Sequence, residues 1–505
     1  MAPAGARAAE MTLAELEQRY LAPGPEFPIH HEDSTWLPLI DGQEYLPCLF
    51  EAIAGTERGD AVFISAFQLG VDTDLNGREP DDPGALPIGE LLAAKAAAGV
   101  DVRVILAGGA IGSLPAPLGP FRMNLVTAHH LRHWTPRGAA AGEYPLTRRV
   151  LLDWSGHPLG SNHQKFVLVR RGRRLAAFVG GMDIDQFRFD GKPHDRHSVG
   201  GRRWGWHDAA QRLTGSAATR VWELFRARWR ETTSLPRRLF WLPPAAPRLM
   251  NPPPHLGDPG PPPRIPPGVA PGKSLQVARS FGWRKRVGLR LAPTRWKEFP
   301  SRGVREVFDL LSHAIDGATR YVYVEDQYFR EFPGAKRAFS PFPPVRRALE
   351  RGVKVVFLCS GVDNDATKTP SNRELNGEVR RQLIEPLSAE ALGNFAFYRV
   401  DHLTVHSKVV LIDDVFACIG SANFFSRSMS GVDHELSVGV VDTGDEVRDL
   451  RVRLWAEHLR VDLDVPETRA RLEDLDDALG MWRTDWGAGI GAPPRESVLQ
   501  LVGPE

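Results

Sequence analysis

An internal repeat is the feature that most restricts how this chain can fold. The segment "NHQKFVLV" at residues 162–169 carries a His-x-Lys triplet that runs into an apolar stretch, and "VHSKVVLI" at residues 405–412 does the same. A polar turn and a second apolar stretch that ends in small residues follow each triplet. A chain that contains one strand–turn–strand unit twice is expected to fold as two similar halves.

The segments that surround each triplet match as well. "AVFISAFQL" at residues 61–69 and "YVYVEDQYF" at residues 321–329 both read as strands that finish in polar residues. In each half a helical pattern stops at a glycine, Gly99 or Gly352, and a valine-rich strand follows. This alternation predicts an α/β fold with largely parallel strands, built as two α/β sandwich halves related by a pseudo-two-fold axis.

A proline-dense segment divides the two copies. With 505 residues the chain is too long for one hydrophobic core. The proline content of this segment prevents a helix or a central strand, so we expect a semi-rigid connector. We therefore predict a first half at residues 1–242, a proline-rich linker at 243–272 and a second half at 273–505.

Composition bears on the partners and the location of this protein. The formal net charge is +1, so no overall positive field favours a nucleic acid as partner. The three cysteines show neither a disulfide framework nor a zinc spacing, which suits a reducing compartment. We find no signal peptide and no apolar window long enough to cross a membrane. The expectation is a cytoplasmic monomer that contacts membranes only at their surface.

The His-x-Lys triplets are the strongest candidates for chemistry. Alternate residues of a strand share one face, so His163 and Lys165 point the same way, as do His406 and Lys408. One such pair alone is weak support for a site, because a histidine and a lysine two positions apart occur in many chains. Two pairs at matching positions of a repeat indicate one site shared by the halves, at a domain interface where pockets are common.

These features together resemble the phospholipase D superfamily, whose signature is similar to His406-x-Lys408, Asp413 and a closing "GSAN" at residues 420–423. The segments "QVARSF", "YVYVEDQYF", "WHDAAQRLTG" and "LRVRLWAEHL" resemble the enzymes of this family that cleave phosphatidylcholine. The resemblance covers most of residues 61–459. It implies the phospholipase D fold and a phosphodiesterase that releases phosphatidic acid and a headgroup from a phospholipid. We expect no metal, no cofactor and no nucleic-acid partner.

The resemblance also implies roles for the four residues of the triplets. Lys165 and Lys408 would neutralise the phosphate oxygens, the task that other enzymes give to a metal ion. The resemblance makes His163 the nucleophile that forms a phosphohistidine and His406 the acid that protonates the leaving group. The symmetry of the motif leaves the reverse order open.

Two acidic residues are candidates for orienting the histidines. Asp208 follows the first triplet and Glu435 follows the second, each at the start of an apolar stretch where a lone charge is costly to bury. A carboxylate on the far nitrogen of a histidine fixes its tautomer and its orientation. We predict this role for both residues, in keeping with the family.

Small and polar residues after each hairpin are expected to contact the substrate. Small residues let the backbone approach a ligand closely, and polar side chains add hydrogen bonds. The predicted set is Gly180, Gly181, Asp183, Ser421 and Asn423.

The family motif usually has an aspartate five residues after the lysine, where the resemblance implies a structural role. Asp413 occupies this position in the second copy, whereas the first copy has Arg170. The opposite strand parity turns this position away from the phosphate, so the departure bears on packing at the turn rather than on chemistry.

Alternative functions remain open at this point. The same chemistry would suit a nuclease or a cardiolipin-synthase-like phosphatidyl transferase, and Arg170 raises the alternative of a lipid-binding scaffold without turnover. Trp204 and Trp206 fit either a substrate groove or aromatic core packing. Six further histidines complete no zinc spacing and are assigned to solvated loops. They are His30, His31, His129, His130, His194 and His197.

Overall fold

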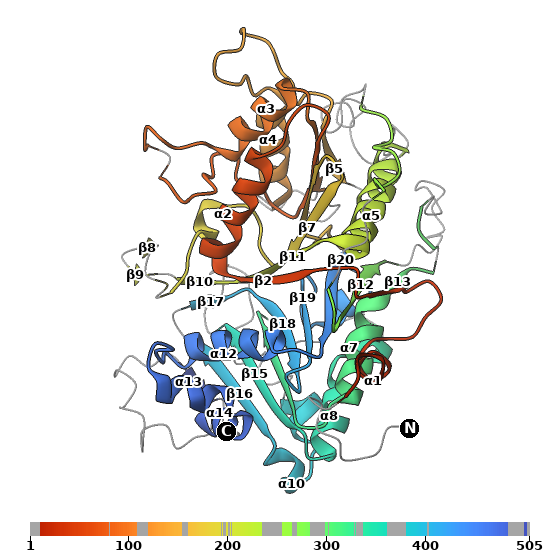
Figure 1. Cartoon of the computed structure of the whole chain (residues 1–505), viewed down its shortest axis with the longest axis vertical. Coiled ribbons are helices and arrows are strands. Elements are labelled where there is room, and N and C mark those ends of the chain that lie inside the picture. The colour runs from red at the N-terminus through yellow and green to blue at the C-terminus, as the bar shows by residue number, and fades with distance from the viewer. Residues whose placement is uncertain are drawn as a thin grey trace.

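Each half of the molecule is built around one β-sheet, and the two halves lie one above the other in Figure 1. The computed structural model describes residues 11–79, 81–108, 120–153, 160–192, 194, 198–199, 202–203, 205–234, 255–264, 270–282, 298–300, 302–327, 329, 337–360, 380–400, 403–482 and 499–501. The predicted α/β architecture is confirmed, because helices cover the faces of both sheets.

The first sheet has the strand order β2-β11-β7-β6-β3-β4-β5. Its strands are β2 (Trp36–Ile40), β3 (Ala61–Ala66), β4 (Asp101–Ala107), β5 (Val150–Asp153), β6 (Phe166–Arg171), β7 (Arg174–Gly180) and β11 (Ala209–Leu213). Strands β3, β4 and β5 run parallel, and the other neighbours are antiparallel. One face packs on α2 (Asp41–Ala54), α3 (Ile88–Ala97) and α4 (Pro120–Arg132), and the other packs on α5 (Gly215–Ser234).

The second sheet has the order β1-β12-β20-β19-β18-β14-β15-β16-β21, with β13 beside β12. Its strands are β1 (Ile29–His31), β12 (Lys273–Phe281), β13 (Val304–Arg305), β14 (Tyr321–Asp326), β15 (Lys354–Ser360), β16 (Phe395–Val400), β18 (Lys408–Ile412), β19 (Phe416–Gly420), β20 (Glu435–Asp442) and β21 (Leu499–Leu501). Its faces carry α1 (Leu13–Tyr20), α7 (Glu306–Gly317), α8 (Phe342–Glu350), α12 (Glu446–His458), α13 (Pro466–Glu473) and α14 (Leu475–Met481).

Short elements complete the described fold. They are η3 (Gln186–Arg188), η4 (Arg337–Phe339), η5 (Arg380–Ile384), α10 (Ala389–Leu392), α11 (Ser426–Met429), β8 (Ser198–Val199), β9 (Arg202–Arg203), β10 (Gly205–His207) and β17 (Leu403–Val405). None of the described helices is long and apolar enough to cross a membrane.

The sequence prediction of largely parallel strands is wrong for most neighbours in each sheet. Within the two large sheets, only the β3-β4-β5 and β14-β15-β16 runs are parallel among the described strands. The reason lies in the hairpins β6–β7 and β18–β19, whose short turns force their two strands to run antiparallel.

The repeat in the sequence becomes a repeat in register. Strand β3 pairs with β6, and β14 pairs with β18, so Val62 faces Val169 and Val322 faces Ile412 at equivalent positions of the two ladders. Each hairpin's second strand then joins the next strand of its sheet, β11 or β20. An apolar core that includes Phe63 of the first sheet and Leu411 of the second connects the two halves.

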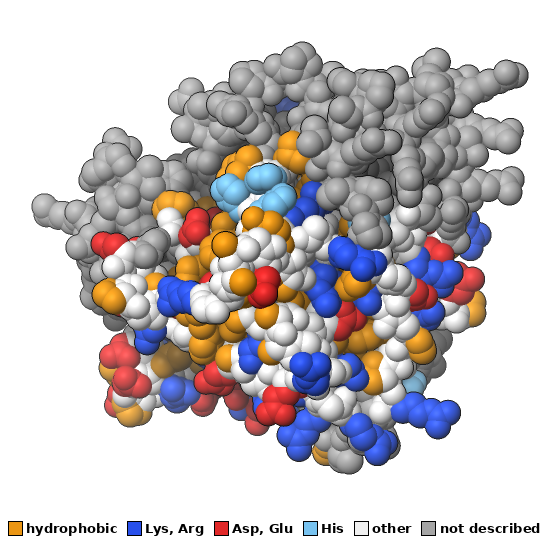
Figure 2. Space-filling view, turned by 90° about the horizontal axis from the view of Figure 1, so that it is seen from above, with side chains coloured by type: hydrophobic (Ala, Val, Ile, Leu, Met, Phe, Trp, Pro, Cys, Tyr) orange, Lys and Arg blue, Asp and Glu red, His pale blue; other side chains and the backbone are white. Residues whose placement is uncertain are grey.

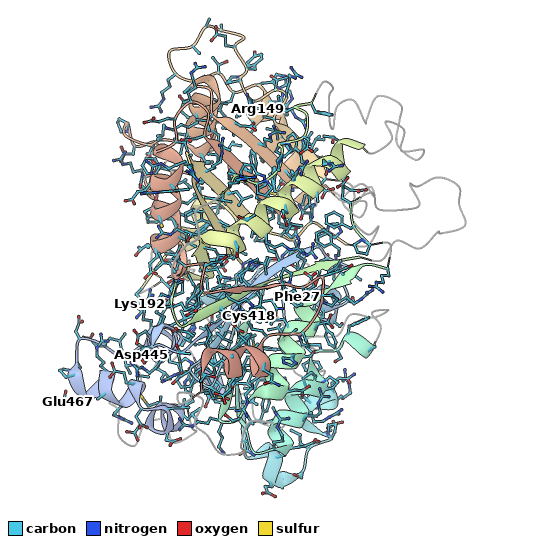
Figure 3. The ribbon with its side chains drawn as sticks, turned by 45° about the vertical axis from the view of Figure 1, so that its right-hand side comes forward. Phe27, Arg149, Lys192, Cys418, Asp445 and Glu467 are labelled. Carbon is cyan, nitrogen blue, oxygen red and sulfur yellow. The ribbon has the colours of Figure 1, made fainter. Side chains whose placement is uncertain are left out.

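The N-terminal segment differs from the expected domain boundary, which placed residues 1–242 in the first half. Strand β1 pairs with β12 of the second sheet, and α1 packs against α7. Tyr20 at the end of α1 donates a hydrogen bond to Asp413 in the second half (2.8 Å). Figure 3 shows Phe27 of this segment on the same side of the molecule as Cys418 of β19. The apolar face of α1 is buried there, and sequence order alone gave no sign of it.

The proline-rich connector is described at residues 255–264. Here it runs along α5, where the indole nitrogens of Trp222 and Trp229 donate to the carbonyl oxygens of Gly260 and Leu256 (3.2 and 3.1 Å). Arg226 also forms a two-pronged ion pair with Asp258. These contacts give the described stretch of the connector a fixed path without regular secondary structure.

Candidate active site

Both His-x-Lys triplets lie at the same point of their hairpins. His163 and Lys165 precede β6, while His406 precedes β18 and Lys408 begins it. Both lysine residues are buried, with exposed fractions of 3% and 4%, and their ammonium groups donate to the carbonyl oxygens of their own histidines. The predicted pairing of an imidazole and an ammonium group on one strand face is present in both halves.

Two short parallel pairings bring the halves together at these residues. Strand β10 pairs with β17, so that the N–H of His406 donates to the carbonyl of His207 (2.8 Å). On the other side, Asn162 and His434 form a parallel bridge, and the N–H of His163 donates to the carbonyl of His434 (3.0 Å). Each catalytic candidate is therefore held by backbone from the opposite half.

Each histidine is also paired with a carboxylate from the opposite half. Nδ1 of His163 lies 3.1 Å from both carboxylate oxygens of Glu435 and 3.0 Å from the carbonyl oxygen of Ser421. Since the carbonyl oxygen of Ser421 can only accept, Nδ1 carries the proton and Nε2 keeps its lone pair. This tautomer is the one that a nucleophilic imidazole requires.

His406 is held by Asp208 of the first half. Its Nδ1 lies 2.7 Å from Oδ2 of Asp208, and the second oxygen of this carboxylate accepts from the N–H of Ala209 (2.9 Å). The carboxylate is fully buried, so its orientation is fixed. The structure thus gives each histidine a carboxylate on Nδ1, a geometry that supports the role predicted for Asp208 and Glu435.

The four groups of the triplets influence one another's ionisation. Burial and the charges of Lys165 and Lys408 together lower the pKa of His163 to about 3. Burial, together with Lys408 and other nearby cations, also holds the pKa of His406 well below its usual range. Lysines from both halves act on each imidazole, which places all four residues around one centre.

The supporting groups also have shifted pKa values. Burial raises the pKa of Glu435 to about 7 and raises that of Asp208. Burial lowers the pKa of Lys408 to about 8, although nearby carboxylates oppose the shift. Strongly perturbed groups that converge at the contact between two halves are typical of catalytic sites.

The middle residue of each triplet faces the opposite side and anchors the strand. Gln164 donates to the carbonyl of Glu435 (2.9 Å) and accepts from Arg228 (3.0 Å). Ser407 donates to the buried carboxylate of Glu325 in β14. These contacts lock the backbone that presents the histidines and lysines, although sequence analysis had assigned no role to Gln164, Ser407 or Glu325.

The small residues after the hairpins allow the two halves to approach. A Cβ atom on Gly181 would lie 2.4 Å from Asp208 and 3.2 Å from the side chain of Lys408, and one on Gly180 would lie 2.6 Å from the backbone of Ala209. Ser421 donates its hydroxyl to Glu435 (2.6 Å). These three residues position the catalytic candidates, and their predicted contact with substrate remains a prediction.

Asp183 and Asn423 occupy matching positions in the two halves. Asp183 accepts from two backbone N–H groups of the first half and lies 3.5 Å from the ammonium of Lys165. Asn423 donates to Asp326 at the end of β14 (2.9 Å). Both residues brace the site, and direct binding of substrate by either one also stays a prediction.

Asp413 and Arg170 stand at equivalent positions but make different contacts. The buried carboxylate of Asp413 accepts from Tyr20, from the hydroxyl and N–H of Thr319, and from the N–H groups of Arg320 and Tyr321, at 2.7–2.9 Å. Asp413 therefore fixes the turn, in agreement with its predicted structural role.

Arg170 lies in β6, and its guanidinium donates to the carbonyl of Gly59. Asp60 supplies the acid at this corner by accepting from the N–H groups of Gly172 and Glu57 (2.7 and 2.9 Å). Neither Arg170 nor Asp60 contacts the triplet of the first half through a hydrogen bond. The departure from the family motif is thus confined to the turn.

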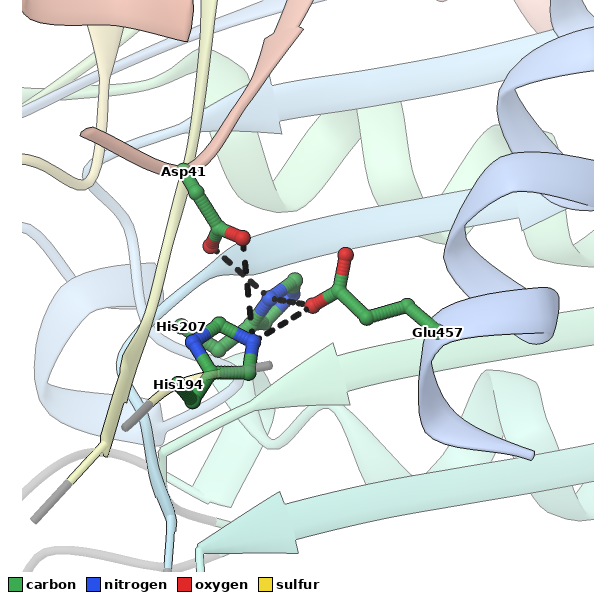
Figure 4. A group of neighbouring side chains, drawn as sticks. All are labelled: Asp41, His194, His207 and Glu457. Atoms are coloured by element: carbon green, nitrogen blue, oxygen red, sulfur yellow. Dashed lines mark hydrogen bonds and ion pairs between the residues drawn. The ribbon is translucent and has the colours of Figure 1, made fainter. Parts of the chain in front are cut away.

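A second cluster of ionisable groups contains His207, the neighbour of Asp208 in the chain (Figure 4). His194 and His207 face Asp41 and Glu457, with Nε2 of His194 and Nδ1 of His207 2.9 and 2.6 Å from Oε1 of Glu457. Burial alone would lower the pKa of His194, but Asp41 and the other carboxylates raise it to about 10. The assignment of His194 to a solvated loop is therefore wrong.

This cluster also offers a set of ligand atoms. The two imidazoles and two carboxylates place one donor atom each within 4.8 Å of one another, and His207, Glu325 and His458 form a second such group. Nitrogen and carboxylate oxygen donors of this kind suit a divalent cation. The four residues of the first group are spread from position 41 to position 457, so no local spacing could have revealed them.

The other histidines have separate environments. His129, His130 and His133 are exposed on and just after α4, and Figure 2 shows histidine side chains gathered on that face. His31 is exposed, but His30 is buried and bonds to Ser216 (2.6 Å). The assignment of His30 to a solvated loop is wrong because β1 joins the edge of the second sheet beside β12. His197 and Trp204 lie outside the described residues.

One further cation lies beside the acid candidate. Arg188, at the end of η3, holds its guanidinium carbon 3.2 Å from the centre of the Trp206 ring. The Trp206 ring in turn lies 5.2 Å from that of His406. The sequence had suggested a groove or core role for Trp206, but it gave no reason to single out Arg188.

Comparison with known proteins identifies several relatives. Residues 311–455 match a protein family described as "Cardiolipin synthase, PLD-like domain". Phospholipase D alpha 1 from Oryza sativa subsp. japonica is 24% identical over 563 residues, which cover 86% of this chain and 66% of the relative. Phospholipase D alpha 1 from Ricinus communis is 23% identical over 547 residues, which cover 84% of this chain and 65% of the relative. The chain thus spans slightly less than two thirds of the length of these relatives.

A solved structure shares the fold. The crystal structure of phosphatidylserine synthase from Haemophilus influenzae Rd KW20 superposes with a TM-score of 0.50 at 14% sequence identity, and the match covers 93% of this chain and 100% of that one. The likeness extends over both halves of the chain and concerns their fold.

Proposed function

The chain belongs to the phospholipase D superfamily, and we propose that it hydrolyses the phosphodiester of glycerophospholipids to phosphatidic acid and a free headgroup. The observation that carries this proposal is the crossed arrangement of the two triplets, in which each histidine is oriented by a carboxylate of the opposite half. Relatives named phospholipase D support the lipid substrate.

The first step would transfer the phosphatidyl group to the protein. Nε2 of His163 attacks phosphorus while the bond from phosphorus to the headgroup oxygen breaks, and His406 gives its Nε2 proton to the departing alkoxide. Lys165 and Lys408 stabilise the charge on the non-bridging oxygens. The low pKa of His163 keeps this ring neutral, as a nucleophile must be.

The acid role of His406 requires a proton that its lowered pKa disfavours in the free site. The cations around it, first of all Lys408, contribute to that lowering. An anionic phosphodiester bound between the lysines would offset their charge and raise the pKa of His406. Substrate binding would therefore recruit the proton that the leaving group needs.

The second step reverses the proton transfer. His406, now neutral, takes a proton from water as the water oxygen attacks phosphorus and the bond to His163 breaks. Phosphatidic acid is released, and both histidines return to their starting states. An alcohol in place of water would give a transphosphatidylation product through the same intermediate.

Phosphatidyl transfer is the second candidate, favoured by the description of the matching family as a cardiolipin synthase domain. It shares every step up to the phosphohistidine and differs only in the acceptor. The geometry of the triplets does not separate the two. A phospholipid substrate in either case requires contact with a membrane surface, which we propose to be peripheral.

The proposal is tested by headgroup release from phosphatidylcholine vesicles and by mass spectrometry of acid-quenched protein. We expect choline release by the wild-type chain and a phosphatidyl adduct on His163. Addition of phosphatidylglycerol as acceptor would divert product to cardiolipin-type lipids if transfer dominates, and single-stranded DNA serves as the nuclease substrate. Absence of any adduct, with release unchanged in His163→Ala and His406→Ala, would overturn the proposal.

A further inference from the structure

Arg188 is a half-buried cation whose bonding is incomplete. Its Nε and Nη1 atoms are enclosed, yet neither has a hydrogen-bond acceptor among the described residues. The indole nitrogen of Trp206, beneath the guanidinium, is equally enclosed and equally without an acceptor. Buried N–H groups are almost always bonded in folded proteins, so three orphaned nitrogens in one place point to a missing ligand.

The carboxylates around Arg188 are already engaged elsewhere. Asp183 faces Lys165 and two backbone N–H groups, and Asp208 holds His406. Asp185 accepts from the N–H of Phe187 (2.9 Å). These acids stabilise the charge of the guanidinium from a distance, but they leave its N–H groups without an acceptor.

The position of Arg188 identifies the kind of ligand. Its plane rests on Trp206, which stands 5.2 Å from His406, the group assigned to the leaving-group side of the phosphate. A guanidinium presents a rigid fork that matches the oxygens of a phosphate, whereas Lys165 and Lys408 act as point charges. An indole that supports the fork keeps it oriented before a ligand arrives.

We propose that Arg188 is a third cationic ligand of the site and donates to a non-bridging oxygen of the substrate's phosphoryl group. Its assignment to substrate rests on the proposed function, but phosphate binding by this group can be tested without turnover. Trp206 is the positioning residue that holds the guanidinium beside His406.

The experiment measures binding of inorganic phosphate to the full chain by isothermal titration calorimetry. Arg188→Ala is expected to weaken phosphate affinity about tenfold to a hundredfold, the loss associated with a hydrogen bond to a charged group. Arg188→Lys should recover part of that loss because it keeps the charge without the fork. Lys192→Gln, which removes an exposed positive charge from the same segment, is the matched control and should bind like wild type.

Two readouts separate binding from mere support of the neighbouring residues. If Arg188 only tunes His406 and Asp208, Arg188→Ala will shift the pH dependence of phosphatidylcholine hydrolysis and leave phosphate affinity unchanged, which would overturn the proposal. Absence of phosphate binding by the wild-type chain would overturn it as well. Arg188-dependent phosphate binding without hydrolysis of phosphatidylcholine would support this inference and reject the proposed function instead. If Arg188→Ala fails to fold, Arg188→Lys and Arg188→Gln provide the same comparison.

Discussion

The two hairpins that present the triplets have the same backbone frame but are fixed by different acids. At the turn between β18 and β19, Asp413 gathers five donors from the start of β14 and from α1. At the turn between β6 and β7 the equivalent position is Arg170, and Asp60, just before β3, accepts from the hairpin. The fold needs an acid at each corner, but that acid can come from either side.

At the two histidines, by contrast, the two halves are closely alike. Both histidines are tied through Nδ1 to a carboxylate of the other half, at 2.7 Å for His406 and 3.1 Å for His163. The parts that touch the reaction are repeated closely, and the parts that only hold the turns have diverged. The four predictions below test how far that equivalence extends.

The largest loss of activity is expected from replacing either histidine, and the two losses should differ because His163 and His406 have different roles. His163→Ala should lower headgroup release by about 10³-fold or more, whatever the leaving group, because no adduct can form. His406→Ala should lose about 10²- to 10⁴-fold with phosphatidylcholine, the range for a missing general acid. With a p-nitrophenyl headgroup, which leaves without a proton, His406→Ala should keep a burst of one p-nitrophenol per chain. Equal bursts in both variants would show that the roles are not divided in this way.

Loss of the carboxylate with the shorter hydrogen bond is expected to lower kcat more than loss of the other. Asp208→Asn removes a 2.7 Å acceptor from His406 and is expected to lower kcat by about 10²- to 10⁴-fold. Glu435→Gln should cost less at pH 7, because the pKa of Glu435 is raised to about 7 and the carboxyl is partly protonated there. Steady-state rates of both variants between pH 6 and pH 8 check the order. A greater loss in Glu435→Gln throughout this range would contradict it.

Lys408 should set the alkaline limit of activity. Burial lowers its pKa to about 8, so the ammonium is charged below that pH and loses its proton as the pH rises through it. The value of kcat/KM is therefore expected to fall about tenfold per pH unit above pH 8. Lys408→Arg, which stays charged, should have a lower maximum but no decline between pH 8 and pH 9.5. A wild-type rate that is flat to pH 9.5 would remove this role from Lys408.

The smallest effects on turnover are expected at the turns. Asp413→Ala should lower the free energy of unfolding by about 3 kcal/mol or more, because buried donors lose their acceptor. Asp60→Ala, at a half-exposed corner, should cost about 1 kcal/mol, and Arg170→Ala about 0.5 kcal/mol with unchanged hydrolysis. Urea denaturation followed by activity measurements tests all three. A strong loss of turnover in a folded Arg170→Ala chain would show that the divergent turn does reach the chemistry.

Much of this site could be predicted because it depends on local periodicity. Strand parity places His163 with Lys165 and His406 with Lys408, and the repeat indicates that the pairs converge. Strand parity also predicts that Arg170 points away from the triplet, and its guanidinium bonds to the carbonyl of Gly59. These inferences need only the rule that alternate residues of a strand share a face.

The remaining features depend on contacts between distant segments. Asp208 reaches His406 through the pairing of β10 with β17, two segments separated by about two fifths of the chain. His194 was misplaced because its carboxylate partners come from the start of α2 and the end of α12. The position of Arg188 beside the site depends on its stacking on Trp206, which the sequence does not reveal. No residue pattern along the chain encodes these neighbours.

The attachment of β1 to β12 has a consequence for how the protein is made. The N-terminal strand leaves the ribosome early, yet its partner strand begins at Lys273 and the sheet beyond it is completed only by β20. At about 5–20 residues per second, several tens of seconds pass before residue 442 is synthesised. Strand β1 and helix α1 therefore lack their partners until β12 and α7 have been made, and the sheet that they join stays incomplete until β20 follows.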